Sequence, residues 1–270
     1  MPPSARTIEA RDDAPSVRIE RTVVVVAARD EAQRLGATLA ALRRALPDAE
    51  LWVADDRSRD ATAAIGGAMG AHVVSSSRGR GKGAAVEAAV LAALASDASD
   101  VTSARTPAER TLIVLCDGDL AETAYDLREL AARAASRPGG LLVASFEQTR
   151  GGGFGLVRRI AAWAIARERE GAGPDAPLSG QRALRASELR NLLPLARGYG
   201  LEVGMTIDAL RSGMSLVELP LALAHRARGR TPAGFAHRGR QLLHVARACV
   251  ARTLLVRRVT SGLLGRRALR

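Results

Sequence analysis

Short apolar segments alternate with segments of helical spacing over the first 150 residues. Five apolar runs have the length and β-branched content of strands that are buried on both faces, as in a parallel sheet. They are residues 22–28, 50–56, 71–76, 111–117 and 140–146. Helical spacing is found in residues 30–46, 59–70, 82–95 and a segment near 123–135. The alternation predicts an α/β fold, a mostly parallel central sheet flanked by helices.

The pattern changes after residue 150, where the glycine-rich stretch 150–155 predicts a loop. The elements predicted beyond it are a helix over 156–170, a loop over 171–183, a loop that enters a helix over 198–213, and one or two strands over 214–226. We expect residues 1–20, which are polar and contain proline, to be poorly ordered. The remaining chain divides into one domain over 21–231 and a C-terminal basic helical segment over 232–270.

Composition limits the cellular setting and the kind of core. The 270 residues are 47% hydrophobic but only 3% aromatic, so the core must be built from Ala, Leu and Val. No run of about 18 apolar residues occurs, and the first 21 residues lack the apolar stretch of a secretory signal. The two cysteines, Cys116 and Cys249, do not make a disulfide framework. These features are typical of a cytosolic protein.

The formal net charge of +12 would suit nucleic acid, an anionic membrane surface or a phosphorylated substrate as partner. It could also reflect the arginine-rich composition of the chain alone. Nucleic acid is disfavoured, because the basic residues are not interleaved with stacking aromatics and no zinc-finger, RRM or KH pattern occurs.

Acidic residues follow three of the predicted strands. They are the pairs Asp30 and Glu31, Asp55 and Asp56, and Asp117 and Asp119. The ends of parallel strands share one edge of a sheet, so these carboxylates should converge on one cleft. Such clustering is costly unless a cation offsets it, and a hard divalent cation with a phosphate is the natural partner. The alternative is that an acid such as Asp30 or Asp60 caps the helix that follows it.

Lys82 is the only lysine of the chain and lies between Gly81 and Gly83 in the stretch GRGKGAAV. A phosphate-binding loop of the Walker type is disfavoured, because Gly83 stands where Ser or Thr would follow the lysine. A dinucleotide-binding dehydrogenase is also disfavoured, because no G-x-G-x-x-G follows the first strand. We expect Lys82 at the start of the third helix, beside the acidic cleft.

Four motifs in register resemble family 2 glycosyltransferases. They are VVVVAARDEAQRLGATLAAL, VADDRSRDAT, GRGKGAAV and LCDGDL, which occur in the family's order over residues 22–120. Farther on, PLSGQRA (177–183) and GYGLEVGMTID (198–208) resemble glucosyl-3-phosphoglycerate synthases and related enzymes. Ala27, Asp30 and Arg57 depart from the family's usual Pro, Asn and Gly. The Q-x-x-R-W signature of processive members is absent, which favours transfer of a single sugar.

The resemblance implies the GT-A fold, with a Rossmann-like nucleotide-sugar half over 21–150 and an acceptor half over 151–231. The residues implied in binding a UDP- or GDP-linked sugar are Ala28, Glu31, Asp55, Asp56, Lys82, Asp117 and Gly118. It implies Mg²⁺ or Mn²⁺ as cofactor, held by Asp117, Asp119 and His225, with His237 as the rival third ligand.

Glu202 and Asp119 are the implied catalytic residues. Glu202 would act as the base in an inverting reaction, or would orient the sugar or the acceptor in a retaining one. An anionic acceptor is implied to bind through Ser179, Gly180, Arg182 and Arg226. The neighbouring Arg228, Arg230 and Arg238 could serve the same site or form a solvated basic face.

Three functions stay open at this point. The first is transfer of one sugar to a phosphorylated small molecule, and the second is transfer to a polyprenyl phosphate at the membrane surface. The third is a non-catalytic basic binding protein on a GT-A scaffold. The segment 232–270 could correspondingly lie on an anionic membrane, pack on the catalytic domain, or contact a second subunit in a homodimer.

Overall fold

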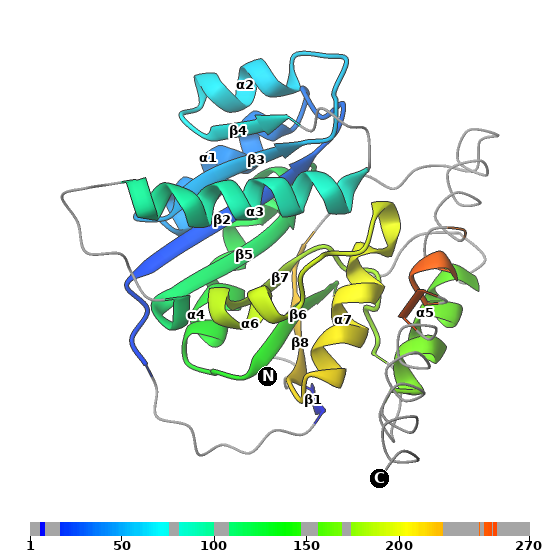
Figure 1. The fold of residues 1–270 in the computed structure, drawn as a ribbon. Coiled ribbons are helices and arrows are strands. Elements are labelled where there is room, and N and C mark those ends of the chain that lie inside the picture. The colour runs from blue at the N-terminus through cyan, green and yellow to red at the C-terminus, as the bar shows by residue number, and fades with distance from the viewer. Residues whose placement is uncertain are drawn as a thin grey trace, which may run out of the picture.

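An eight-stranded sheet forms the centre of the protein in the computed structural model, with the strand order β1-β8-β6-β7-β5-β2-β3-β4 (Figure 1). The strands are β1 (Arg6–Ile8), β2 (Arg21–Ala28), β3 (Glu50–Asp55), β4 (His72–Ser75), β5 (Thr111–Asp117), β6 (Gly140–Phe146), β7 (Arg182–Arg185) and β8 (Ser215–Leu221). The structure describes residues 6–8, 17–75, 81–99, 108–146, 156–168, 174–223, 243, 246–249 and 251–252.

Most of the strands run in the same direction. β2 is parallel to β3 and β5, β3 is parallel to β4, and β6 is parallel to β8. β7 is inserted antiparallel between β5 and β6, and the short β1 is antiparallel to β8 at the edge. The predicted mostly parallel α/β fold is therefore confirmed. Strands from both predicted halves share this one sheet.

Helices cover both faces of the sheet. On one face lie α1 (Leu35–Ala45), α2 (Thr62–Ala68) and α4 (Leu127–Ala135). On the other face lie α3 (Lys82–Ser99), α5 (Leu156–Ala166), α6 (Ala186–Asn191) and α7 (Leu201–Arg211). Three 3₁₀ turns, η1 (Ala108–Arg110), η2 (Ala121–Asp126) and η3 (Gly198–Gly200), complete the described elements.

The core on the α3 face is built mainly from Ala, Leu and Val, as the low aromatic content predicts. Ala85, Ala89 and Ala93 repeat every fourth residue along α3 and are buried, so they form a smooth stripe that packs against the sheet. Figure 1 shows α3 lying across β2 and β3, and Val23 of β2 and Trp52 of β3 belong to the same core. Small residues let this helix approach the sheet closely, and its first residue is Lys82.

The strands predicted over 111–117 and 140–146 have the same bounds in the structure, and those at 22–28, 50–56 and 71–76 differ by a residue. The helix predicted over 30–46 begins only at Leu35, since the residues before it form turns. The helix expected near 123–135 is divided into η2 and α4. Part of the tail that the sequence predicts to be poorly ordered, Arg6–Ile8, forms β1.

The strand β7 and the helix α6 are missing from the sequence prediction, which places a loop over 171–183. The sequence of β7 is Arg-Ala-Leu-Arg, which lacks the apolar run by which the other strands are found. Both arginines are nevertheless buried. Because their long side chains find partners inside the protein, the strand is interior although its sequence reads as polar.

The residues predicted to act near the C-terminal end lie mostly outside the described part of the chain. These include His225, Arg226, His237 and most of the segment 232–270, in which 246–249 and 251–252 are helical. Among the helices of the described residues, none is long and apolar enough to cross a membrane.

Arg185 ties three segments together at the end of the sheet opposite to Asp117. Its guanidinium donates to the carbonyl oxygens of Glu109 (2.6 Å), Val17 (3.0 Å) and Ala135 (3.1 Å). Ala135 is the last residue of α4, where a cation favours the helix dipole.

Replacing this buried cation should therefore destabilise the fold. We expect Arg185→Leu to lower the free energy of unfolding by about 3 kcal/mol, because three carbonyl groups lose a charged donor. Arg44→Leu, which removes a solvent-exposed ion pair with Glu122, is the control and should cost less than about 1 kcal/mol. Urea unfolding followed by circular dichroism measures both, and equal effects of the two substitutions would contradict the assignment.

Candidate active site

The ends of three parallel strands meet at one edge of the sheet, as the acidic motifs predict. The register pairs Ala28 of β2 with Asp55 of β3, and Ala27 of β2 with Asp117 of β5. The backbone N–H of Asp56 donates to the carbonyl oxygen of Ala28 at 3.0 Å. The carboxylates that follow β3 and β5 are therefore placed on either side of the end of β2.

Gly118, one of the residues implied in nucleotide-sugar binding, packs closely against β2. Its N–H donates to the carbonyl oxygen of Ala27 at 2.9 Å. A Cβ atom at this position would lie 3.2 Å from the Cβ of Ala28 and 3.3 Å from the oxygen of Ala27. The close approach that requires glycine here is therefore to β2 of the protein itself.

Lys82 bridges two carboxylates at the centre of the site. Its Nζ atom lies 2.6 Å from Oδ1 of Asp117 and 2.7 Å from Oε1 of Glu202. The side chain of Lys82 is 20% exposed, that of Asp117 32% and that of Glu202 6%. The bridge joins the first residue of α3 to the end of β5 and to the first turn of α7.

The electrostatics of this bridge keep Lys82 charged. Burial lowers the pKa of its ammonium group, but the carboxylates of Asp117 and Glu202 outweigh burial, and the net pKa is raised above its usual value. Lys82 therefore acts as a fixed positive charge at neutral pH and is unsuited to accept a proton.

The glycines on either side of Lys82 bring α3 against the loop that leads into α7. Gly81 has a φ of +80°, which glycine adopts without strain, and a Cβ there would lie 3.0 Å from Cα of Gly198. A Cβ at Gly83 would lie 1.9 Å from the carbonyl oxygen of Ala196. This backbone contact explains how Lys82 reaches Glu202, which lies 120 residues later in the chain.

The loop before β7 contacts the same carboxylate of Asp117. The Nε2 atom of Gln181 donates to Oδ2 of Asp117 at 2.9 Å. A Cβ atom at Gly180 would lie 2.6 Å from Oδ2 of Asp117 and 2.8 Å from Nζ of Lys82. Of the two residues predicted to bind the acceptor, Gly180 lies against Asp117, and Ser179 contacts Gln181. Gln181 itself is absent from the residues predicted from the sequence. The signal that could have found it is its place in the PLSGQRA motif.

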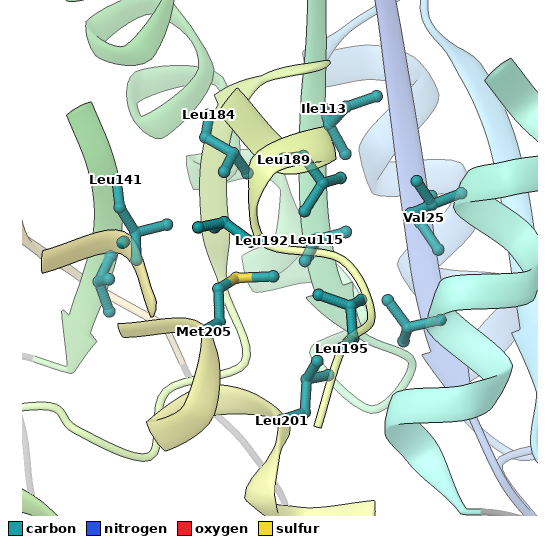
Figure 2. Packing of buried hydrophobic residues seen from close by; sticks show 14 of the residues in the cluster. Val25, Ile113, Leu115, Leu141, Leu184, Leu189, Leu192, Leu195, Leu201 and Met205 are labelled. Atoms are coloured by element: carbon teal, nitrogen blue, oxygen red, sulfur yellow. The ribbon is translucent and has the colours of Figure 1, made fainter. Parts of the chain in front are cut away.

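The packing of α7 in the core fixes the position of Glu202. Figure 2 shows Leu201 and Met205 of this helix directed toward Leu115 of β5 and Leu195, all members of the buried core. These anchors fix the first turn of α7, so the carboxylate of Glu202 is held at its position beside Lys82.

Arg182, which the resemblance implies in acceptor binding, lies in the interior of the protein. Its side chain is fully buried and donates to the carbonyl oxygen of Ser179 at 2.8 Å and to the hydroxyl of Thr206 at 2.8 Å. Thr206 in turn donates to the backbone oxygen of Glu202. Burial lowers the pKa of Arg182 to about 10, with Glu202 acting in the opposite direction. Arg182 thus supports the loop and α7.

The acids after β3 are held by local hydrogen bonds. Asp55 accepts from the N–H of Ser58 at 3.1 Å and from the hydroxyl of Ser75 at 3.2 Å, and Asp56 accepts from Arg29 at 3.3 Å. Both acids are buried. Their oxygens lie beside β2 and could accept hydrogen bonds from a bound base or ribose.

The acids around the first two helices are held in turns. The N–H of Glu31 donates to the hydroxyl of Thr62 at 2.8 Å. Asp30, with a φ of 54°, accepts from the N–H of Arg59 at 2.8 Å, so it does not cap α1. Asp60 accepts from the N–H groups of Ala32 and Thr62, but the N-cap position of α2 is Ala61, which has no side-chain capping hydrogen bond. The hydroxyl of Thr62 also donates to Asp60, and this hydrogen bond lowers the pKa of the Asp60 carboxyl.

The donor set fits a divalent cation that shares its ligands with a phosphate. Asp117 and Asp119 flank Gly118 where β5 ends, and the carbonyl oxygen of Asp119 accepts from Arg34 at 3.2 Å. Within the described part of the chain, no three His, Cys, Asp or Glu side chains gather as a ready-made metal site. Mg²⁺ and similar ions are typically held by one or two carboxylates together with substrate phosphates.

Residues 23–178, more than half of the chain, match the sequence pattern described as glycosyl transferase family 2. The chain belongs to glycosyltransferase family 2. The resemblance of its four motifs is thereby confirmed, and the protein is a glycosyltransferase with the GT-A fold. No curated protein matches the chain.

Solved structures of glucosyl-3-phosphoglycerate synthase from Mycobacterium tuberculosis are similar to this glycosyltransferase. The complex with Mn²⁺, UDP and glucosyl-3-phosphoglycerate has 25% identity and a TM-score of 0.63, and the complex with phosphoglyceric acid has 26% and 0.64. Each covers 86% of this chain and 79% of the synthase. A complex with Mn²⁺, UDP-glucose and phosphoglyceric acid has 25% identity and a TM-score of 0.63, and covers 85% and 79% of the two chains.

The contact between α3 and the loop before α7 can be tested with two helical glycines. Gly83→Ala should lower the free energy of unfolding by about 1–3 kcal/mol, because the new methyl group meets the backbone of Ala196. Gly67→Ala in α2 is the matched control: a Cβ there meets nothing within 4 Å, so it should stabilise by about 0.5–1 kcal/mol. Urea midpoints report both changes. If Gly83→Ala were as stable as Gly67→Ala, the contact would be wrong.

Proposed function

We propose that this glycosyltransferase moves a single sugar from a nucleotide-diphosphate sugar to a phosphorylated small molecule. The observation that carries the proposal is the charged Lys82 bridge between Asp117 and Glu202, placed at the strand edge beside Asp55 and Asp56. It puts a fixed cation among carboxylates where a diphosphate and its cation would lie.

The donor would lie across the ends of β2, β3 and β5. Glu31, Asp55 and Asp56 would accept hydrogen bonds from the base and the ribose, since carboxylates are acceptors only. Ala28 would form the floor between them, beside Gly118. A uridine nucleotide is supported by the similar synthase, whose structures contain UDP and UDP-glucose.

Asp117 and Asp119 would hold Mg²⁺ or Mn²⁺ together with the diphosphate. The similar synthase contains Mn²⁺ beside UDP. When bound, the cation would stabilise the negative charge on the departing nucleoside diphosphate. A third ligand from His225 lies outside the described residues.

Glu202 would contact the transferred sugar or the acceptor hydroxyl. Its carboxylate is nearly buried, is held by Lys82, and belongs to the first turn of α7. A carboxylate fixed in this place could accept a hydrogen bond from a hydroxyl group and so hold that group in one orientation for the reaction.

The acceptor would bind beside Ser179 and Gly180, of which Gly180 lies against Asp117 in the structure. A phosphorylated acceptor is supported by the synthase, whose complexes contain phosphoglyceric acid. Arg182 would act by holding this loop, and Arg226 lies outside the described residues.

The test is the release of UDP or GDP from nucleotide sugars in the presence of Mn²⁺ and 3-phosphoglycerate. We expect turnover, and we expect Asp119→Ala to reduce kcat by at least about 100-fold, because the charge on the leaving group loses its counter-ion. Asp126→Ala is the control and should retain activity, since this acid at the end of η2 pairs with Arg128 of α4. Chelation of Mn²⁺ should abolish the turnover of the unmodified enzyme.

Two results would contradict parts of the proposal. If the protein is active only on a detergent-dispersed polyprenyl phosphate and not on 3-phosphoglycerate, the proposed acceptor is wrong and the proposed donor stands. The absence of both turnover and affinity for any nucleotide sugar would favour a non-catalytic binding protein instead.

A further inference from the structure

Gln181 is a buried polar residue that touches the carboxylate at the centre of the site. Its side chain is 0% exposed, and its Nε2 atom donates to Oδ2 of Asp117 at 2.9 Å. On the other side of the same carboxylate, Lys82 lies 2.6 Å from Oδ1. The two oxygens of Asp117 therefore have different kinds of partner.

The orientation of the Gln181 amide is set by Ser179. The hydroxyl of Ser179 donates to Oε1 of Gln181 at 2.9 Å and accepts from the N–H of Gln181 at 3.4 Å. A reversed amide would place Oε1 against the Asp117 carboxylate, where two acceptors would repel. The hydrogen-bonding capacity of the groups thus decides which end of the amide faces Asp117.

The backbone on both sides of this contact is fixed. The carbonyl oxygen of Gln181 accepts from the N–H of Ala144 in β6 at 2.9 Å, and the register pairs Asp117 with Ala27 of β2. The strand fixes the Cα and Cβ of Asp117 but leaves the plane of its carboxylate free, because the last torsion of an aspartate has a broad energy minimum. The partners of the carboxylate must set that plane.

We propose that Gln181 is a positioning residue, which holds the carboxylate of Asp117 in the orientation that binds the divalent cation. Gln181 engages Oδ2, so that Oδ1 is the oxygen presented toward Lys82. This inference rests on the proposed function for the part that Asp117 has in cation binding. The contact itself does not depend on it.

The affinity for Mn²⁺ tests this role of Gln181, because a purely structural role would leave that affinity unchanged. We expect Gln181→Met, which keeps the length of the side chain but lacks the amide, to weaken Mn²⁺ binding in the presence of UDP by about 10- to 100-fold. Gln181→Glu should weaken it at least as much, since it places a second acceptor against Asp117. Electron paramagnetic resonance of free Mn²⁺ measures the affinity at a temperature at which each variant is folded.

Ser215→Ala is the matched control for a lost buried hydrogen bond. The Ser215 hydroxyl donates to the carbonyl oxygen of Gly139 at 3.3 Å, and Ser215 begins β8 at the opposite end of the sheet. This variant should bind Mn²⁺ as the unmodified protein does, even if its stability falls. Equal Mn²⁺ affinity of Gln181→Met and the unmodified protein would overturn the positioning role.

A second measurement tests the contact without any ligand. In a double-mutant cycle of Gln181→Met and Asp117→Ala in metal-free protein, the unfolding constants should show a coupling of about tenfold, as for a hydrogen bond to a charged group. No coupling would overturn the inference whether or not the protein binds nucleotide. If coupling is found but the unmodified protein binds neither Mn²⁺ nor UDP, the proposed function fails, and with it the role of Gln181 in cation binding.

Discussion

The ammonium group of Lys82, held between Asp117 and Glu202, is the interaction on which the geometry of the site depends. Charges that are largely removed from water are stable only when they are paired, so the ammonium of Lys82 offsets the burial of both carboxylates and keeps them close together. The pairing brings together the start of α3, the end of β5 and the first turn of α7. Glycine at two positions keeps room for this pairing: a Cβ at Gly83 would meet the backbone of Ala196, and a Cβ at Gly180 would meet Asp117 and Lys82.

The packing of α3 on the sheet supplies this geometry. With so few aromatic residues, the chain packs α3 on the sheet through alanines, and the helix places its first residue at the strand edge. On the other side of the site, β7 is inserted antiparallel between β5 and β6, and it carries the Ser179–Gln181 loop to Asp117. The carboxylate of Asp117 thus contacts both Lys82 of α3 and the loop before β7.

The sequence was sufficient for the fold where it is regular. The apolar runs at 111–117 and 140–146 are strands with those bounds, because runs of this kind are buried on both faces. β7 could not be found, because both of its ends are arginines whose burial depends on distant partners. Arg182 was assigned to the acceptor for the same reason: the sequence shows its charge but not that its fork is turned inward. Lys82 could be placed beside the acidic cleft, whereas its contact with Glu202 needed the fold.

The central claim is that the nucleotide and its cation bind beside the Lys82 bridge. A crystal structure with UDP and Mn²⁺ tests it most directly, because the anomalous scattering of manganese locates the cation. We expect a single strong peak within coordination distance of the carboxylates of Asp117 and Asp119, with the diphosphate between that peak and the start of α3. Manganese or nucleotide bound at another place, with Lys82 still closed on Asp117 and Glu202, would contradict the assignment.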